Sequence, residues 1–140
     1  MISVISVDDH EMISLGLEKL FSETKDISLC HSCKTKAGLE PFIESKTLQE
    51  LKDMIAMVDI KLEGESGFDC ADFLLGKGIK CLMYSSFSNV GFIVKTMEHK
   101  IKGFITKNAD KAEIMEAIRT VSRIFDKFNV KNRYELGRYL

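Results

Sequence analysis

Short apolar runs alternate with segments of helical periodicity along most of this chain. Each run is bounded by polar residues, which is typical of a strand buried on both faces of a parallel sheet. We predict five such strands, at Ile2–Val7, Ile27–Cys33, Met54–Val58, Ile79–Tyr84 and Gly103–Ile105.

The segments between these runs carry apolar residues three or four positions apart, the spacing of one face of a helix. The second helix contains Pro41, which we expect in its first turn because a proline deeper in a helix removes a hydrogen bond. Gly76 and Gly78 should end the third helix, and Asp110 should cap the start of the fifth. Apolar positions within Met12–Phe21, Leu39–Ile43, Phe68–Leu75, Phe92–Met97 and Ala112–Val121 mark the five helices.

Five strand and helix pairs in succession predict an α/β fold, a doubly wound five-stranded parallel sheet with helices on both faces. The chain has 140 residues, of which 45% are hydrophobic and 29% charged, so it is long enough for one ordinary globular domain. Its net charge of −1 gives no bulk preference for nucleic acid or a membrane surface. We find no cleavable signal peptide or membrane-length apolar stretch and expect a cytoplasmic protein.

The four cysteines do not form a recognisable metal or redox motif. Cys30 and Cys33 stand in the sequence C-H-S-C, but in a strand two residues three apart point to opposite faces. A zinc site would also need a second ligand pair, which the spacing does not provide. We therefore expect Cys30, Cys33, Cys70 and Cys81 to be reduced cysteines of the core.

Polar residues of complementary type follow four of the predicted strands. Carboxyl ends of neighbouring parallel strands meet at one edge of the sheet, where α/β proteins place their sites. Three carboxylates gathered there repel one another, and a hard divalent ion such as Mg²⁺ would neutralise them. Any one of these polar residues could be an ordinary helix cap, turn residue or surface residue. Five of them at four neighbouring strand ends are harder to explain as unrelated caps and surface residues. The set comprises Asp8, Asp9, Asp59, Ser85 and Lys107.

Four motifs at these strand ends resemble those of a bacterial two-component response regulator receiver domain. The resemblance covers roughly residues 1–122 and implies a flavodoxin/CheY-like (βα)5 fold. D-D-H-E-x-x-x-x-G-L at Asp8–Leu17 is most similar to receivers of the LuxR/NarL subfamily, which normally carry a C-terminal helix-turn-helix. The motifs are V-D-D-H at Val7–His10, V-D-I-K-L-E-G-E-S-G at Val58–Gly67, M-Y-S-S at Met83–Ser86 and G-F-I-T-K at Gly103–Lys107.

The resemblance implies a role for each site residue. Asp59 would be the phosphoacceptor, taking a phosphoryl group from a phosphohistidine of a sensor histidine kinase. Mg²⁺ would be bound by Asp9, Asp59 and the Lys61 backbone carbonyl, with Asp8 holding a metal-bound water.

Further residues would complete the phosphoryl site. Lys107 and the Ser85 hydroxyl would contact phosphoryl oxygens. Phe104 would be the aromatic residue that swings inward behind Ser85, and Gly67 matches the glycine after the phosphorylation loop. His10 follows the acid pair, and we expect it to begin the first helix rather than take part in the chemistry.

The chain departs from the family pattern at a few positions. Glu63 replaces a proline four residues after the acceptor and adds a negative charge near the site. Lys100 and Ile101 replace a Gly-Ala pair before the last strand, on the surface used for signalling output. Asn108 replaces the proline that often follows the lysine. None of these changes removes a residue needed for phosphorylation.

The segment 123–140 closely resembles the last part of a LuxR-type DNA-binding domain, without the helices that should precede it. Its lysines and arginines outnumber its acids by three (five minus two). Without a complete recognition helix, base-specific contacts have no scaffold, so we expect a helical tail and no DNA binding by this chain alone. Its apolar residues should pack on the receiver or on a partner subunit. They are Ile124, Phe125, Phe128, Val130, Tyr134, Leu136, Tyr139 and Leu140.

Our leading interpretation is a receiver that is phosphorylated on aspartate and signals by protein–protein contact, not an enzyme with a separate substrate. A homodimer, or a heterodimer with a related regulator, remains open. The alternatives are a DNA-binding transcriptional regulator with a reduced C-terminal domain and a non-phosphorylated pseudo-receiver that acts as a binding module. A Mg²⁺-dependent phosphatase of similar fold is least favoured, because such families share only one of the acid motifs.

Overall fold

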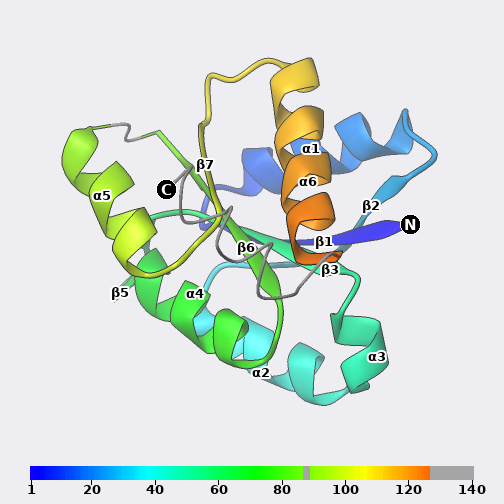
Figure 1. The fold of residues 1–140 in the computed structure, drawn as a ribbon, viewed down its shortest axis with the longest axis horizontal. Helices are drawn as coiled ribbons and strands as arrows, with labels where there is room; N and C mark the ends of the chain where they lie inside the picture. The colour runs from blue at the N-terminus through cyan, green and yellow to red at the C-terminus, as the bar shows by residue number, and fades with distance from the viewer. Residues whose placement is uncertain (87–88, 127–140) are drawn as a thin grey trace.

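The computed structural model describes residues 1–86 and 89–126 of the chain. Its centre is a five-stranded parallel sheet with the strand order β2-β1-β3-β6-β7, and a separate antiparallel pair, β4-β5, follows β3 (Figure 1). The strands are β1 (Ile2–Val7), β2 (Ile27–Cys33), β3 (Met54–Val58), β4 (Lys61–Leu62), β5 (Glu65–Ser66), β6 (Lys80–Ser85) and β7 (Gly103–Thr106).

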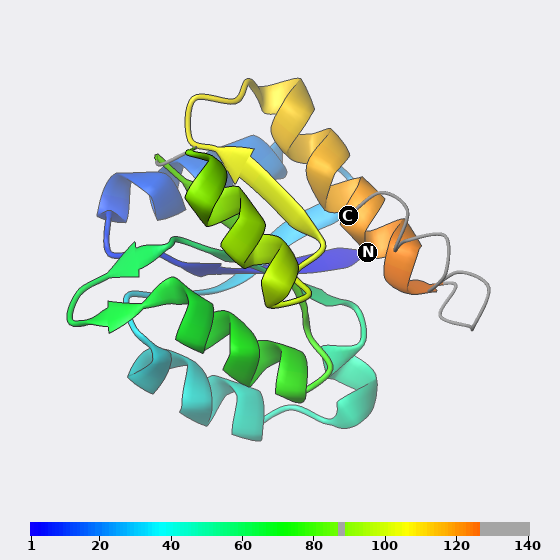
Figure 2. The ribbon, with the colours of Figure 1, turned by 60° about the vertical axis from the view of Figure 1, so that its left-hand side comes forward.

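Helices cover both faces of the sheet. Helices α1 and α6 lie together over one face, and α2, α4 and α5 lie on the other side (Figures 1 and 2). The helices are α1 (Glu11–Ser22), α2 (Lys36–Glu44), α3 (Leu48–Leu51), α4 (Gly67–Gly76), α5 (Val90–Glu98) and α6 (Lys111–Asp126). The described part of the chain therefore has the predicted doubly wound α/β architecture.

The core consists of two hydrophobic clusters separated by the sheet. One joins α1 and α6 to the sheet through side chains such as Leu17, Phe21 and Ile118. The other lies under α2, α3 and α4 and includes Leu39 and Leu74. All five residues of β3 are buried, which explains its uninterrupted apolar sequence.

The first three strands have the predicted bounds, and the last two are shifted or extended by one residue. β6 runs from Lys80 to Ser85, and β7 reaches Thr106, because Ser85 still pairs with Thr106. The sequence reasoning missed α3 and the β4-β5 hairpin. Both are too short for periodicity to reveal, although Thr47 and Glu50 form a capping box at the start of α3.

The expected position of Pro41 is wrong. Helix α2 begins at Lys36, so Pro41 is its sixth residue and cannot donate the hydrogen bond that would reach the Ala37 carbonyl. The helix starts this early because the Glu65 carboxylate accepts a hydrogen bond of 2.5 Å from the Lys36 backbone N–H. A side chain from the β4-β5 hairpin thus fixes the start of α2.

The cysteines are only partly where we expected them. Cys70 and Cys81 are buried, and burial raises the pKa of both thiols, that of Cys70 to about 12. Cys33 is half-buried with its pKa raised to about 11, again by burial. Cys30 is exposed, which corrects the expectation that it belongs to the core. The pairing of β1 with β2 skips Cys30, so it is the extra residue of a β-bulge.

Helix α6 continues through the boundary predicted at residue 122 and ends at Asp126. The predicted helical tail is therefore described only over its first residues, and 127–140 lie outside the described residues. Among the described helices, none has the length and apolar character that a membrane crossing requires.

Candidate phosphoryl and metal site

Asp8 and Asp59 lie side by side just past the carboxyl ends of β1 and β3. The Asp59 N–H donates to the Val7 carbonyl, and the Asp8 N–H donates to the Cys33 carbonyl, both at 3.0 Å. These bonds extend the parallel ladders by one residue, so the sheet itself positions both acids. Each residue is only 4% exposed. Two buried carboxylates held this close need a positive neighbour.

Lys107 supplies that positive charge from the end of β7. Its backbone N–H donates to the Ser85 carbonyl at 2.9 Å, which ties the end of β7 to the end of β6. Its Nζ lies 2.6 Å from Asp8 Oδ2 and 3.0 Å from Asp59 Oδ2. Burial opposes the charge of Lys107, but its hydrogen bonds and attraction to the two acids outweigh this and raise its pKa. Lys107 therefore remains protonated at neutral pH.

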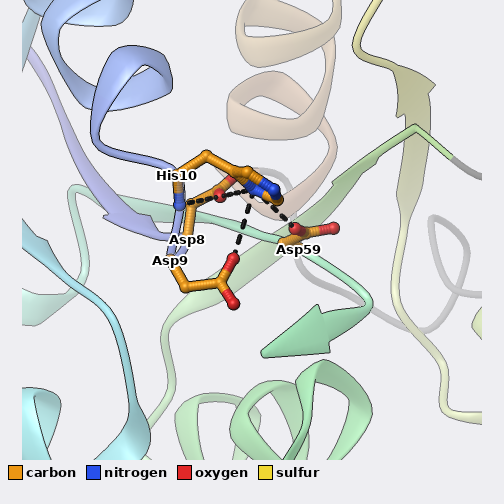
Figure 3. Close-up of side chains that lie close together, drawn as sticks. All are labelled: Asp8, Asp9, His10 and Asp59. Atoms are coloured by element: carbon orange, nitrogen blue, oxygen red, sulfur yellow. Dashed lines mark hydrogen bonds and ion pairs between the residues drawn. The ribbon is translucent and has the colours of Figure 1, made fainter. Parts of the chain in front are cut away.

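His10 takes a more central place than the sequence indicated. It is the N-cap of α1, as expected, and its backbone N–H donates to Asp8 Oδ1 at 2.8 Å. Figure 3 shows its ring among the three acids. Nδ1 lies 2.8 Å from Asp8 Oδ1, 3.2 Å from Asp9 Oδ1 and 3.6 Å from Asp59 Oδ2. The signal that could have found it is its position directly after the acid pair, at a helix start that faces the site.

The other predicted site residues surround this cluster at different depths. Ser85 is the last residue of β6 and is fully buried. Phe104, in β7, is half-buried and packs against the core cluster beneath α4. Lys61 begins β4, two residues after Asp59, and is exposed. Beside Lys107 is an open hollow of about 330 Å³, lined by Ser86, Thr106, Lys107 and Asn108.

Gly67 shapes the loop that follows Asp59. Its N–H donates to the Ile60 carbonyl at 2.7 Å, which closes the loop just before α4. A Cβ at this position would lie 1.7 Å from the Asp59 backbone oxygen. Only glycine fits at this close approach, because a methyl group would displace the residue that carries the central carboxylate.

The donor set of this cluster fits a divalent cation. One ligand atom each from Asp8, Asp9, His10 and Asp59 lie within 4.8 Å of one another. Asp9 Oδ1 is buried and takes part in no hydrogen bond with the described residues, although His10 Nδ1 lies nearby. Carboxylate oxygens are the ligands that Mg²⁺ prefers, and an orphaned buried oxygen gains most from a cation.

Comparison with known proteins shows the family of this chain. The profile of the response regulator receiver domain matches residues 4–119. The chain belongs to this receiver domain family. Among curated relatives, the transcriptional regulatory protein DesR of Bacillus subtilis is 23% identical over 121 residues, and the response regulator GacA of Pseudomonas protegens is 25% identical over 123. The alignments cover 86% of this chain but only 58% and 55% of those proteins. The receiver thus spans little more than half their length.

Solved receiver structures have the same fold. A LuxR-family two-component response regulator from Aurantimonas sp. SI85-9A1 superposes with a TM-score of 0.73 at 20% identity, covering 86% of this chain and 84% of that one. At this identity the likeness concerns the fold alone. It confirms the CheY-like receiver architecture.

Proposed function

We propose that this receiver accepts a phosphoryl group on Asp59 from a sensor histidine kinase. The observation that carries the proposal is the contact between the buried Asp59 carboxylate and Lys107, beside two further acids. Lys107 is positioned to neutralise negative charge that arrives on Asp59. A purely structural ion pair would not need the additional carboxylates of Asp8 and Asp9, which repel Asp59.

The proposed reaction is a transfer of one phosphoryl group. A carboxylate oxygen of Asp59 forms a bond to phosphorus while the bond from phosphorus to the donor histidine nitrogen breaks, and the imidazole of the kinase leaves. Lys107 would hold the phosphoryl oxygens by charge and hydrogen bonding. The Ser85 hydroxyl would bind another phosphoryl oxygen, and Phe104 would move inward as the end of β6 shifts. We expect no turnover of a separate substrate.

Magnesium is the cofactor we propose for this site. Asp9, Asp59 and the Lys61 backbone carbonyl would bind it, with Asp8 acting through a water molecule. When bound, Mg²⁺ supplies positive charge that stabilises the transferring phosphoryl oxygens. The chain's own contribution is to hold these oxygen donors together on two strand ends.

The output of the domain is a separate part of the proposal. We propose a receiver over residues 1–122 and a helical tail over 123–140, with signalling in the cytoplasm through protein–protein contact, as a monomer or as a homo- or heterodimer. DesR is by name a transcriptional regulator. Control of transcription, together with a DNA-binding partner, is therefore the alternative output. We do not assign DNA binding to this chain alone.

Phosphorylation of the intact protein tests the proposal. The purified chain would be incubated with acetyl phosphate and Mg²⁺ and examined by rapid intact-mass spectrometry. We expect a mass increase of one phosphoryl group that disappears when EDTA is added or when Asp59→Asn is used. Asp72→Asn is the matched control, because Asp72 lies on α4 and pairs with His99, the residue that caps the end of α5. Phosphorylation of Asp59→Asn, or none of the wild type, would overturn the proposal.

A further inference from the structure

We propose that His10 is a direct ligand of the divalent cation in this receiver, and that it makes the site favour transition ions such as Mn²⁺ over Mg²⁺. The inference rests on the proposed function, because it concerns the same cation site. It adds a nitrogen donor to a set that the family resemblance describes with oxygen donors alone.

The position of the His10 ring carries the proposal. Nδ1 is the ring atom directed at the acids, and it lies within 3.6 Å of one oxygen from each of Asp8, Asp9 and Asp59. These four ligand atoms all lie within 4.8 Å of one another. Since metal–ligand bonds are about 2.0–2.2 Å long, opposite ligands of one ion are about 4.2 Å apart. A small rearrangement would therefore bring His10 Nδ1 onto the same cation as the Asp9 and Asp59 oxygens.

The backbone aims the ring at the site and leaves it free to adjust. His10 has extended φ and ψ angles of −95° and 104° at the N-cap, and its N–H is held by Asp8 Oδ1. The side chain is 63% exposed, so neighbouring side chains do not pack it in place. In the neutral tautomer that carries its proton on Nε2, Nδ1 has a lone pair that can accept from Lys107 Nζ, 3.3 Å away, or bind a cation. Coordination would then exchange polar contacts for a metal bond without repacking the core.

A nitrogen donor changes which ions the site prefers. Mg²⁺ is a hard ion that binds oxygen and keeps several of its waters. Imidazole suits first-row transition ions, whose affinities for mixed nitrogen and oxygen sites exceed that of Mg²⁺. His10 should consequently add to the affinity for Mn²⁺ and contribute little to the affinity for Mg²⁺.

The opposing interpretation is that the ring only occupies the place of the cation. In that case any divalent ion must displace His10, and removing the ring would tighten binding of Mg²⁺ and Mn²⁺ alike. The two interpretations predict opposite changes in Mn²⁺ affinity, so a single substitution separates them.

The first experiment measures metal affinity on the full chain. Free Mn²⁺ would be followed by electron paramagnetic resonance in titrations of the wild type, His10→Ala and the control His31→Ala, with Mg²⁺ measured by competition. His31 is a suitable control because its Nε2 contacts the Gly38 carbonyl and its ring stacks on Phe42. We expect His10→Ala to weaken Mn²⁺ binding roughly tenfold, the low end of losses at perturbed metal sites, and to change Mg²⁺ binding less than about twofold. Unchanged or tighter Mn²⁺ binding in His10→Ala would overturn the inference.

The second experiment detects the nitrogen directly. Pulsed electron paramagnetic resonance of bound Mn²⁺ should show ¹⁴N modulation in the wild type and in His31→Ala, and the modulation should be absent from His10→Ala. A wild-type spectrum without nitrogen coupling would contradict ligation by His10. Mg²⁺-dependent phosphorylation of Asp59, measured in parallel, keeps the two claims separate. If phosphorylation is normal and nitrogen coupling is absent, only the ligation by His10 is contradicted. If Asp59 is not phosphorylated, the proposed function is contradicted, whatever the nitrogen coupling shows.

Discussion

Two loops of this receiver have an unusual backbone geometry, one at a glycine and the other at a lysine. Between β3 and α4, Gly67 lies so close to the Asp59 carbonyl that a Cβ would overlap it. Between α5 and β7, Lys100 adopts a φ of 62°, in the left-handed region that favours glycine. The first position is a glycine, whereas the second is a lysine.

At Gly67 there is no space for a side chain, whereas position 100 only requires an unusual backbone angle. Lys100 occupies the residue after the α5 cap in a Schellman motif, with bonds from Lys100 N–H to the Met97 carbonyl and from Ile101 N–H to the Thr96 carbonyl. Helix α4 ends in the same motif, but there Gly78 occupies the left-handed position with a φ of 81°. A non-glycine residue there costs only about 1–2 kcal/mol. A collision with the backbone of Asp59 would instead disturb the site.

Replacement of Gly67 should have the largest effect. Gly67→Ala should lower the free energy of unfolding by about 3 kcal/mol, the upper end for overpacking, because the new methyl group meets backbone rather than a movable side chain. Urea unfolding would measure the loss. Gly76→Ala is the control in the same helix, where a Cβ meets nothing within 4 Å. Equal stability of Gly67→Ala and Gly76→Ala would contradict the role given to close packing.

Removal of Lys107 should have the second largest effect on stability. The interaction that it makes with Asp59 is an ion pair and not a backbone contact. Lys107→Ala leaves the Asp8 and Asp59 carboxylates buried without their shared cation. We expect a loss of about 2 kcal/mol without divalent ions, below the usual cost of breaking a fully buried pair because solvent can enter. Added Mg²⁺ should restore part of it. Lys111→Ala, at an exposed position on α6, is the control. A loss that Mg²⁺ does not reduce would count against the cation site.

A glycine at position 100 should stabilise the protein. Lys100→Gly removes the left-handed penalty and adds some unfolded-chain entropy, for a net gain of about 0.5–1 kcal/mol. Thermal or urea unfolding would detect it. Gly78→Ala should have the opposite sign at the matching position of α4. A destabilised Lys100→Gly would mean that the lysine side chain contributes more than its backbone costs.

We expect the smallest effect from loss of the ion pair between Arg119 and Asp26, which lies outside both loops. Arg119 on α6 donates to both carboxylate oxygens of Asp26, at 2.8 and 3.0 Å. The hydrogen bond to Arg119 holds the pKa of Asp26 below its ordinary value of 3.8. A lowered folded pKa contributes stability above the unfolded pKa, and this contribution is lost as the pH falls through the folded value. In Arg119→Gln, an NMR titration should show the pKa of Asp26 rising toward 3.8. An unchanged pKa would show that the pair does not persist in solution.

Much of the fold could be predicted because the strands are short, largely apolar runs with polar ends, and β3 is apolar throughout. The acids Asp8 and Asp59 followed from the same pattern, since each directly follows such a run. The short α3 and the β4-β5 hairpin depend on capping and turn contacts that leave little periodic signal. The position of Pro41 depended on Glu65, which is distant in sequence. The direction of the His10 ring could not be predicted, because acids from two different strand ends determine it.

We propose that Asp59, rather than its acidic neighbours, receives the phosphoryl group. Sodium borohydride reduces an aspartyl phosphate to homoserine, which records the phosphorylated position permanently. The chain would be phosphorylated with acetyl phosphate and Mg²⁺, reduced, digested and examined by peptide mass spectrometry. We expect homoserine at position 59 alone, and only when the phosphodonor was present. Homoserine at position 8 or 9, or at none of the three, would contradict it.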